Sequence, residues 1–256
     1  MRAPDPVAFN IFGIDIMWYG LLIGLGFLLA ITISYYRAPK YNIDRDFILT
    51  LTIWIIPSAI VGARLYYVIF SWDKYAGNLS EIFNIRNGGL AVHGGLILCF
   101  IIGYFLCRKN NVSFLNAADL IAPVIALAQA IGRWGNFFNE EAHGGPTNLP
   151  WAQIVDGVGY HPTFLYESIW CFMLFILLMF FSRRREFNGQ IICLYGILYS
   201  VERFFVEGLR TDSLMIGPLR QAQVISLVTI ICCLTIYIVL KKRHLTQNQL
   251  SKGDSK

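Results

Sequence analysis

Residues 163–185 read TFLYESIWCFMLFILLMFFSRRR. Residues 163–182 contain one charged side chain, Glu167, and are long enough to cross the ~30 Å hydrocarbon core of a bilayer as a helix. The three arginines that follow are typical of the cytoplasmic end of a membrane helix. This stretch therefore predicts a membrane span and its direction.

The whole chain shares this apolar character. Of its 256 residues, 56% are hydrophobic and 14% are charged, well below the charged fraction of about 25% in soluble domains. The formal net charge is +5, but the basic residues stand at the edges of apolar runs, so membrane topology explains them. We expect a polytopic membrane protein with no nucleic-acid partner. We expect no cleavable signal peptide, because Arg2, Asp5 and two prolines precede the first apolar run.

Seven apolar runs predict seven transmembrane helices and an all-α fold. They cover residues 14–36, 46–70, 90–107, 114–133, 163–182, 189–208 and 219–240. The fourth is the weakest candidate, because Asn116, Asp119, Pro123 and Gln129 interrupt it. Residues 1–243 are expected to form a single transmembrane catalytic domain, and residues 244–256 a polar, disordered cytoplasmic tail.

Basic residues between the runs predict the orientation. They cluster after the first, third, fifth and seventh runs, whereas the loops on the opposite side hold few. By the positive-inside rule the N-terminus lies outside and the C-terminus in the cytoplasm. The longer outer segments, 71–89 and 134–162, carry Trp and Tyr residues suited to a membrane interface. They are expected to form either a small outer-face cap or plain connecting loops.

Polar residues that are unfavourable in lipid gather near the predicted outer ends of these runs. They are Tyr19, Arg64, His93, Arg133, Asn136, His161, Tyr166, Glu167, Arg203 and Glu207. The predicted orientation would bring polar groups from five or more helices to one level of the membrane. Such a cluster is a functional-site hypothesis by default.

The sixth run carries a helical pattern of polar residues. Tyr199, Arg203, Glu207 and Arg210 are spaced so that they share one helix face. Arg203 and Glu207 can therefore pair. The pair is either a structural link between helices, or it holds a guanidinium ready for a phosphate, which its planar fork binds bidentately.

Residues 132–145 read GRWGNFFNEEAHGG. Arg133 and Asn136 lie about one helical turn apart if the helix continues. Gly132 and Gly135 would let a backbone or a lipid headgroup come close. Arg133 could simply extend to the headgroups as an interfacial residue. The recurrence of Arg, Asn and Glu within this short stretch favours a binding site.

His93 lies between two Gly-Gly pairs, Gly88-Gly89 and Gly94-Gly95. Histidine titrates near neutrality and can accept a proton at working pH. A helix cap or an interfacial residue is the alternative. The six cysteines form no Cys-x-x-Cys pair, so we expect neither a disulfide framework nor a metal site.

These motifs resemble those of the prolipoprotein diacylglyceryl transferases, which are bacterial inner-membrane enzymes. The resemblance covers nearly the whole chain and is carried, in the same order, by Trp18–Gly20, Gly62–Leu65, His93–Leu96, Gly132–Gly144, His161–Thr163, Leu165–Glu167, Arg203–Glu207 and Arg210. It implies transfer of the diacylglyceryl group of phosphatidylglycerol to the lipobox cysteine thiol of a prolipoprotein signal peptide. Glycerol 1-phosphate would be released at the outer, periplasmic leaflet of the inner membrane, among membrane lipids and without a cofactor or metal.

The implied reaction suggests roles for these residues. His93 would take the thiol proton or, if protonated, orient the phosphate. Arg133 and Arg203 would stabilise the leaving phosphate in a water-poor site. Asn136 and Tyr19 would bond the phosphate or glycerol, and Glu141 and Glu207 would orient the arginines. Substrate contacts are further expected at Arg64, Gly144, Tyr199 and Arg210. Glu140 and His143 have no assigned role, and His161 and Glu167 match the family but could instead fix the fifth span to the cap.

Two other classes of protein compete with this interpretation. A transporter or channel predicts a polar path that continues to the cytoplasmic side, where the runs hold little beyond Asp119 and the basic residues at their ends. An intramembrane protease needs paired aspartates, a Ser/His pair or a zinc motif within the runs, and the sequence contains none.

Overall fold

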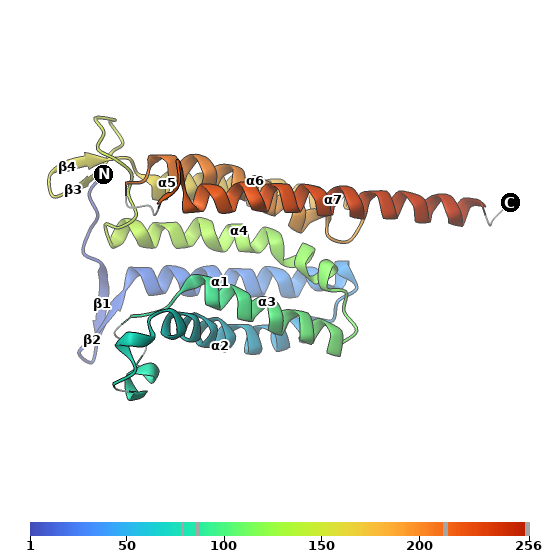
Figure 1. Ribbon diagram of the computed structural model, residues 1–256, viewed down its shortest axis with the longest axis horizontal. Coiled ribbons are helices and arrows are strands. Elements are labelled where there is room, and N and C mark those ends of the chain that lie inside the picture. Colours follow the sequence, from blue (N-terminus) through green and yellow to red (C-terminus); the bar gives the residue numbers. More distant parts are fainter. Residues whose placement is uncertain (78, 85–87, 212–214, 254–256) are drawn as a thin grey trace. The chain divides into compact units, whose positions relative to one another are not determined.

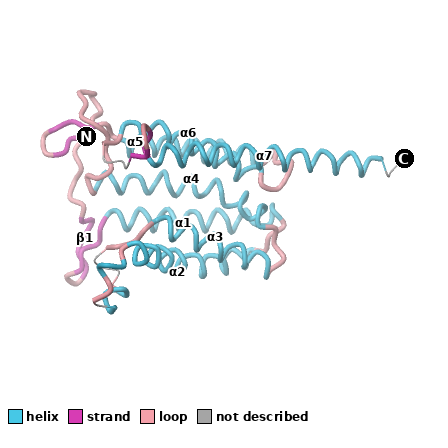
Figure 2. The backbone as a smooth tube through the Cα atoms, in the orientation of Figure 1, coloured by secondary structure: helices cyan, strands magenta, loops and turns pink. Residues whose placement is uncertain are grey.

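The computed structural model describes residues 1–77, 79–84, 88–211 and 215–253. It is mostly helical, and the described part holds seven α-helices and three short antiparallel hairpins (Figures 1 and 2). Two compact units make up the chain. One joins Met1–Ser34 to Ala118–Lys256, and the other is Tyr35–Ala117.

The first unit holds most of the helices. They are α1 (Trp18–Arg37), α4 (Phe114–Phe138), α5 (Thr163–Ser182), α6 (Gln190–Leu209) and α7 (Gln221–Gly253). Its hairpins are β1–β2 (Val7–Ile11, Ile14–Met17), β3–β4 (Gln153–Val155, Val158–Tyr160) and β5–β6 (Met215–Ile216, Leu219–Arg220). Figure 1 shows α5, α6 and α7 alongside one another. Ala122 and Ala126 of α4 form a buried cluster with Leu174, Leu178 and Ile191.

The second unit is built on two close-packed helices. α2 (Arg45–Phe70) and α3 (Val92–Lys109) lie side by side, with the 3-10 turns η1 (Ala38–Tyr41), η2 (Trp72–Lys74) and η3 (Leu79–Phe83) around them (Figure 1). A Cβ atom at Gly94 would lie 2.2 Å from the carbonyl oxygen of Gly62. Small residues at such a crossing let two membrane helices approach backbone to backbone.

Six helices are long and apolar enough to cross a membrane within the part of the chain that the structure describes: α1, α2, α3, α4, α5 and α7. Their outward faces carry large apolar side chains, such as Phe100 and Ile231, more than half exposed, as expected of faces that meet lipid tails. The α6 helix falls outside this set because its 20 residues include Glu202, Arg203 and Glu207.

Asp119, one of the polar residues that interrupt the fourth apolar run, caps α6. Its fully buried carboxylate accepts hydrogen bonds from the N–H groups of Gly189 (2.7 Å), Ile191 (2.9 Å) and Ile192 (2.9 Å). Arg185 Nη1 lies 3.2 Å from the same carboxylate. The first N–H groups of a helix have no partner within the helix and favour negative charge. Asp119 therefore satisfies an otherwise unpaired helix end.

Four sequence predictions need correction. The seventh span begins at Gln221 and not at residue 219, because Leu219 and Arg220 form β6. The first span does not begin at residue 14, because residues 14–17 form β2. The β1–β2 turn contains Phe12 and Gly13, both with positive φ, as a two-residue hairpin turn requires. The fourth helix does not end at 133 but continues to Phe138. Residues 244–253, which were expected to be disordered, are helical, because α7 continues to Gly253. They include residues that favour helices, such as Leu, Lys and Gln.

Candidate functional site

Four charged residues form a chain of ion pairs across three helices of the first unit. Arg133 Nε of α4 lies 2.8 Å from Glu167 Oε2 of α5. Arg203 Nη1 of α6 lies 2.6 Å from Glu167 Oε1. Arg203 Nη2 lies 2.7 Å from Glu207 Oε2. One carboxylate, only 3% exposed, is thus shared by two arginines from different helices.

Among the four residues of the ion-pair chain, Glu167 is the one whose role the sequence left open. The structure places it at the centre, between the two arginines predicted to bind phosphate. The sequence did hint at a role, because Glu167 is the sole charge within an otherwise apolar run. A charged residue in a membrane span is costly and commonly marks a functional site. The expected Arg203–Glu207 pair is confirmed.

Hydrogen bonds beside Glu167 fix α5 against its neighbours. Trp134 Nε1 donates to Ser168 Oγ at 3.1 Å, and Ser168 Oγ donates to the carbonyl of Ala130 at 2.8 Å. Trp170 Nε1 donates to the carbonyl of Leu198 in α6 at 3.2 Å. The carboxylate is therefore held by a helix that is bonded to both helices carrying its partners.

The ion-pair chain leaves guanidinium donors available. Nη1 and Nη2 of Arg133 have no hydrogen-bond partner among the described residues, and the same holds for Nε of Arg203. Both side chains are about one-fifth exposed. Unused, charged donors of this kind can bind an anion such as a phosphate.

Tyr199 and Glu202 lie within electrostatic range of Arg133. Glu202 was not singled out in the sequence. It is 5% exposed, and neither carboxylate oxygen has a hydrogen-bond partner within the described part of the chain. Both residues lie on α6: Tyr199 shares the face of Arg203 and Glu207, and Glu202 precedes Arg203 in the chain.

The block after Arg133 places Asn136 beside Glu141. Asn136 Nδ2 donates to Glu141 Oε1 at 2.9 Å, and Asn139 Nδ2 donates to the same oxygen at 3.4 Å. Glu207 thus contacts an arginine directly, whereas Glu141 holds two asparagines. Glu140 and Ala142 have φ values of 52° and 57°, which are unfavourable for non-glycine residues and recur at functional sites.

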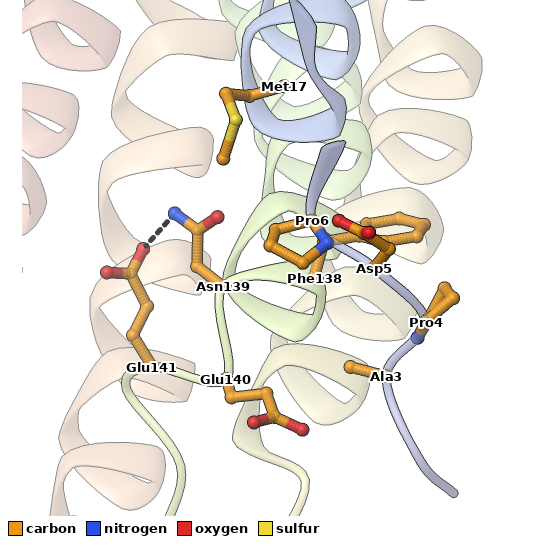
Figure 3. A pocket seen from close by; sticks show the side chains of 9 residues that line it. All are labelled: Ala3, Pro4, Asp5, Pro6, Met17, Phe138, Asn139, Glu140 and Glu141. Carbon is orange, nitrogen blue, oxygen red and sulfur yellow. Dashed lines mark hydrogen bonds between the residues drawn. The ribbon is translucent and has the colours of Figure 1, made fainter. Parts of the chain in front are cut away.

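An open pocket of about 650 Å³ adjoins this block. Figure 3 shows it between the N-terminal segment and the end of α4, with the Asn139–Glu141 hydrogen bond at one side. Its lining consists of residues 3–6, Met17 and residues 138–141. The pocket therefore borders the Asn136–Glu141 pair.

Tyr19 lies against the same end of α4. A Cβ atom at Gly135 would lie 2.4 Å from Tyr19 Cδ2, so the glycine admits the phenol ring. The neighbouring Trp18 ring stacks on Phe138 with centroids 5.2 Å apart. The start of α1 and the end of α4 are thereby packed together.

Gly144 joins the segment after α4 to the ends of α5 and α6. Its N–H donates to the carbonyl of His161 at 2.9 Å, and it forms an antiparallel bridge with Arg210. A Cβ atom at Gly144 would lie 2.7 Å from His161 Cβ. His161 Nδ1 lies 3.4 Å from the hydroxyl of Tyr166. Because of the short distance from His161 Cβ, only glycine fits at position 144 without a shift of its neighbours.

His93 and Arg64 belong to the second unit. His93 lies in the first turn of α3, exposed, with its ring centroid 6.4 Å from that of Tyr66. Arg64 is buried in α2 and donates to backbone carbonyls of the segment between α2 and α3. The ion-pair chain of Arg133 and Arg203 belongs to the first unit.

Comparisons with known proteins agree with the resemblance seen in the sequence. Residues 6–239 match a family model described as prolipoprotein diacylglyceryl transferase. A phosphatidylglycerol–prolipoprotein diacylglyceryl transferase of Finegoldia magna is 54% identical over 253 residues, which cover 98% of this chain and 100% of that protein. Proteins of the same name from Clostridioides difficile and Bacillus cereus are 52% identical (97% of this chain, 99% of that protein) and 46% identical (93% of each). The chain belongs to the prolipoprotein diacylglyceryl transferase family.

Proposed function

We propose that this protein transfers the diacylglyceryl group of phosphatidylglycerol to the lipobox cysteine of prolipoproteins, the first step of bacterial lipoprotein maturation. Family membership supports the reaction type. The observation in the structure that carries the proposal is the buried carboxylate of Glu167, which holds Arg133 and Arg203 together. Two guanidiniums preorganised in this way suit the phosphate of a lipid headgroup.

The chemistry is a displacement at carbon. The substrate thiol loses its proton, and its sulfur attacks the glyceryl carbon that carries the phosphate. The carbon–oxygen bond breaks, its electron pair stays on the phosphate oxygen, and glycerol 1-phosphate leaves. Arg133 and Arg203 act on this oxygen as its negative charge grows, and the unused donors of Arg133 are the first candidates to contact it.

The remaining roles follow the predictions from the sequence, except that Glu141 orients Asn136 and not an arginine. His93 takes the thiol proton, since the thiolate is the attacking species and a free thiol has a pKa near ~8.5. Asn136, oriented by Glu141 at 2.9 Å, and Tyr19 bond the phosphate or the glycerol. Glu207 orients Arg203. Gly144, Tyr199 and Arg210 shape the substrate site.

We further propose that seven helices cross the inner membrane, α6 among them. The charges on Arg203 and Glu207 are paired with each other and with Glu167, which lowers the cost of placing α6 in the bilayer. Basic residues lie at or just beyond the ends of α1, α3 and α5 and in the C-terminal part of α7, so the N-terminus faces outside and the C-terminus the cytoplasm. The substrate site then faces the periplasmic leaflet.

The test is transfer by the purified protein. It is incubated in detergent with phosphatidylglycerol and a peptide containing a lipobox cysteine, and the peptide mass is measured. We expect the mass to rise by one diacylglyceryl group, and a matched peptide with serine in place of the cysteine to stay unchanged. No mass change with folded protein and both substrates would overturn the proposal. It would favour the transporter alternative, in which a solute moves and no bond forms.

A further inference from the structure

Arg64 is a buried side chain of α2, 7% exposed, whose guanidinium faces backbone oxygens. Its hydrogen bonds run from Nε to Ile82 (2.8 Å), from Nη1 to Gly88 and Gly89 (3.0 Å each), and from Nη2 to Glu81 (2.6 Å) and Asn84 (3.1 Å). These bonds engage every N–H donor that a guanidinium has. No donor of Arg64 is left for a substrate phosphate.

The segment that Arg64 holds is shaped to receive it. Gly88 and Gly89 have φ values of 83° and 74°, a conformation that glycine adopts without steric strain. A Cβ atom at Gly89 would lie 2.4 Å from Arg64 Nη1. Tyr75 covers the guanidinium, with its ring centroid 5.1 Å from the central carbon. Position 89, which faces the Arg64 guanidinium, therefore requires glycine.

The neighbours of Arg64 in α2 hold the start of α3. The carbonyl of Ala63 accepts a hydrogen bond from the N–H of Ala91 at 3.0 Å. Gly62 lies in backbone contact with Gly94. Three consecutive residues of α2 therefore fix the chain on both sides of His93.

The His93 ring has no hydrogen-bond partner among the described residues. Its position is consequently set by the backbone around it and by the neighbouring ring of Tyr66, and not by a hydrogen bond. At most four residues separate Gly88 and Gly89 from His93 in the chain. A change at Arg64 that loosens these glycines would therefore also shift His93.

We propose that Arg64 is a positioning residue for His93, and not a ligand of the substrate phosphate. It anchors residues 81–84 and Gly88–Gly89 on α2, so that α3 begins with His93 at a fixed point. The effect on catalysis rests on the proposed function through the role of His93. The anchoring itself does not depend on that function.

The anchoring is tested by hydrogen exchange of the full-length protein in detergent micelles. Arg64→Lys removes the planar fork and some of the donors. We expect faster amide exchange in peptides covering residues 81–95, and no change in α5 and α6. Arg108→Lys is the matched control, because Arg108 is exposed at the far end of α3. Exchange at 81–95 that matches the wild type would overturn the anchoring, whatever the activity.

The link to His93 is tested by kinetics in a double-mutant cycle. We expect Arg64→Lys to lower kcat about tenfold or more in the wild-type background, and less than about twofold in a His93→Gln background, because residues that act as a unit are not additive. KM for phosphatidylglycerol should stay near its wild-type value. An equal factor in both backgrounds, or a raised KM with kcat unchanged, would overturn the proposal.

Gly89→Ala tests the same Arg64 contacts from the glycine side, since the added methyl group would displace Arg64 Nη1. It should reproduce the exchange and kinetic pattern of Arg64→Lys, and it serves if that variant does not fold. A Gly89→Ala protein with wild-type exchange and kcat contradicts the proposal. Absence of transfer by the wild-type protein would instead refute the proposed function, and the exchange data would still decide the anchoring.

Discussion

Glu167 Oε1 lies 2.6 Å from Arg203 Nη1, while the other oxygen of the same carboxylate lies 2.8 Å from Arg133 Nε. The separation of the two guanidiniums is therefore fixed by one side chain from a third helix. A headgroup phosphate bound by both would meet donors that are already in place, which is the condition for effective stabilisation of a developing charge.

Glu167→Gln should remove most of the activity and lower the melting temperature. The amide has no charge, so two largely buried arginines lose their shared partner, and breaking a buried pair costs about 3–5 kcal/mol. Transfer assays and thermal unfolding in detergent measure the two effects. Glu186→Gln is the control, because Glu186 is exposed in the loop between α5 and α6. A Glu167→Gln protein as active as this control contradicts the role given to Glu167.

Arg203→Lys should cut activity severely while the protein still inserts into the membrane. Lysine keeps the charge but cannot bond Glu167 and Glu207 with a planar fork. Loss of a preorganised donor typically lowers the rate by ~10²–10³. The turnover of purified, folded protein is the measurement. A rate close to that of the wild type would show that the fork does not grip the phosphate.

Replacement of all six cysteines by alanine or serine should leave appreciable transfer activity. The nucleophile is the thiol of the substrate, and most of the chain's own cysteines are buried or partly buried in helices. Losses should follow packing, chiefly at the fully buried Cys171. Abolished transfer in a folded and abundant variant would point to a thiol intermediate on the enzyme.

Asp119→Ala should lower stability and leave the kcat of the folded protein near that of the wild type. The change removes the acceptor of the N–H groups of Gly189, Ile191 and Ile192, and one ion-pair partner of Arg185. An unsatisfied buried polar group costs about 1–3 kcal/mol. The melting temperature should therefore fall. Unchanged stability would mean that water replaces the carboxylate at the α6 terminus.

His93→Gln should remove most activity at neutral pH and recover part of it as pH rises. Glutamine keeps a polar shape but cannot take a proton, whereas more of the substrate thiol ionises unaided as pH approaches ~8.5. The ratio of variant to wild-type rate, measured from about pH 6.5 to 9 with peptide below saturation, decides the role. A flat ratio would exclude the base and support a His93 that orients the phosphate.

Hydropathy and helical spacing could predict much of the fold and one contact of the site. Thr163–Ser182 is the predicted fifth span, and the i,i+4 spacing of Arg203 and Glu207 correctly predicted their pair. The first span began too early because Ile14 and Ile16 are as apolar as the helix that follows them. The fourth ended too early because the apolar run stops at Arg133, whereas the helix continues through the polar block to Phe138. Gly132 and Gly135 within it admit Ile23 and Tyr19.

The position of Glu167 could not be predicted in the same way. Its partners lie 34 residues before it and 36 residues after it, and no local periodicity reports a contact between distant helices. The capping of α6 by Asp119 could not be predicted for the same reason, since the carboxylate and the helix end are about 70 residues apart in the chain. A polar residue in an apolar run signals a partner but not its identity.

The shared carboxylate also bears on how the protein is assembled during synthesis. Arg133 leaves the ribosome one helix before Glu167 and two helices before Glu207. An arginine without a counter-charge is unfavourable in an inserting helix, although less so near its end, where Arg133 lies, than at its centre. The α4 helix therefore gains its counter-charge only when α5 has been made, and α6 then brings Arg203 to the same carboxylate. Because the acid lies between two bases in the order of the chain, α5 and then α6 each find an opposite charge on the helix made before them.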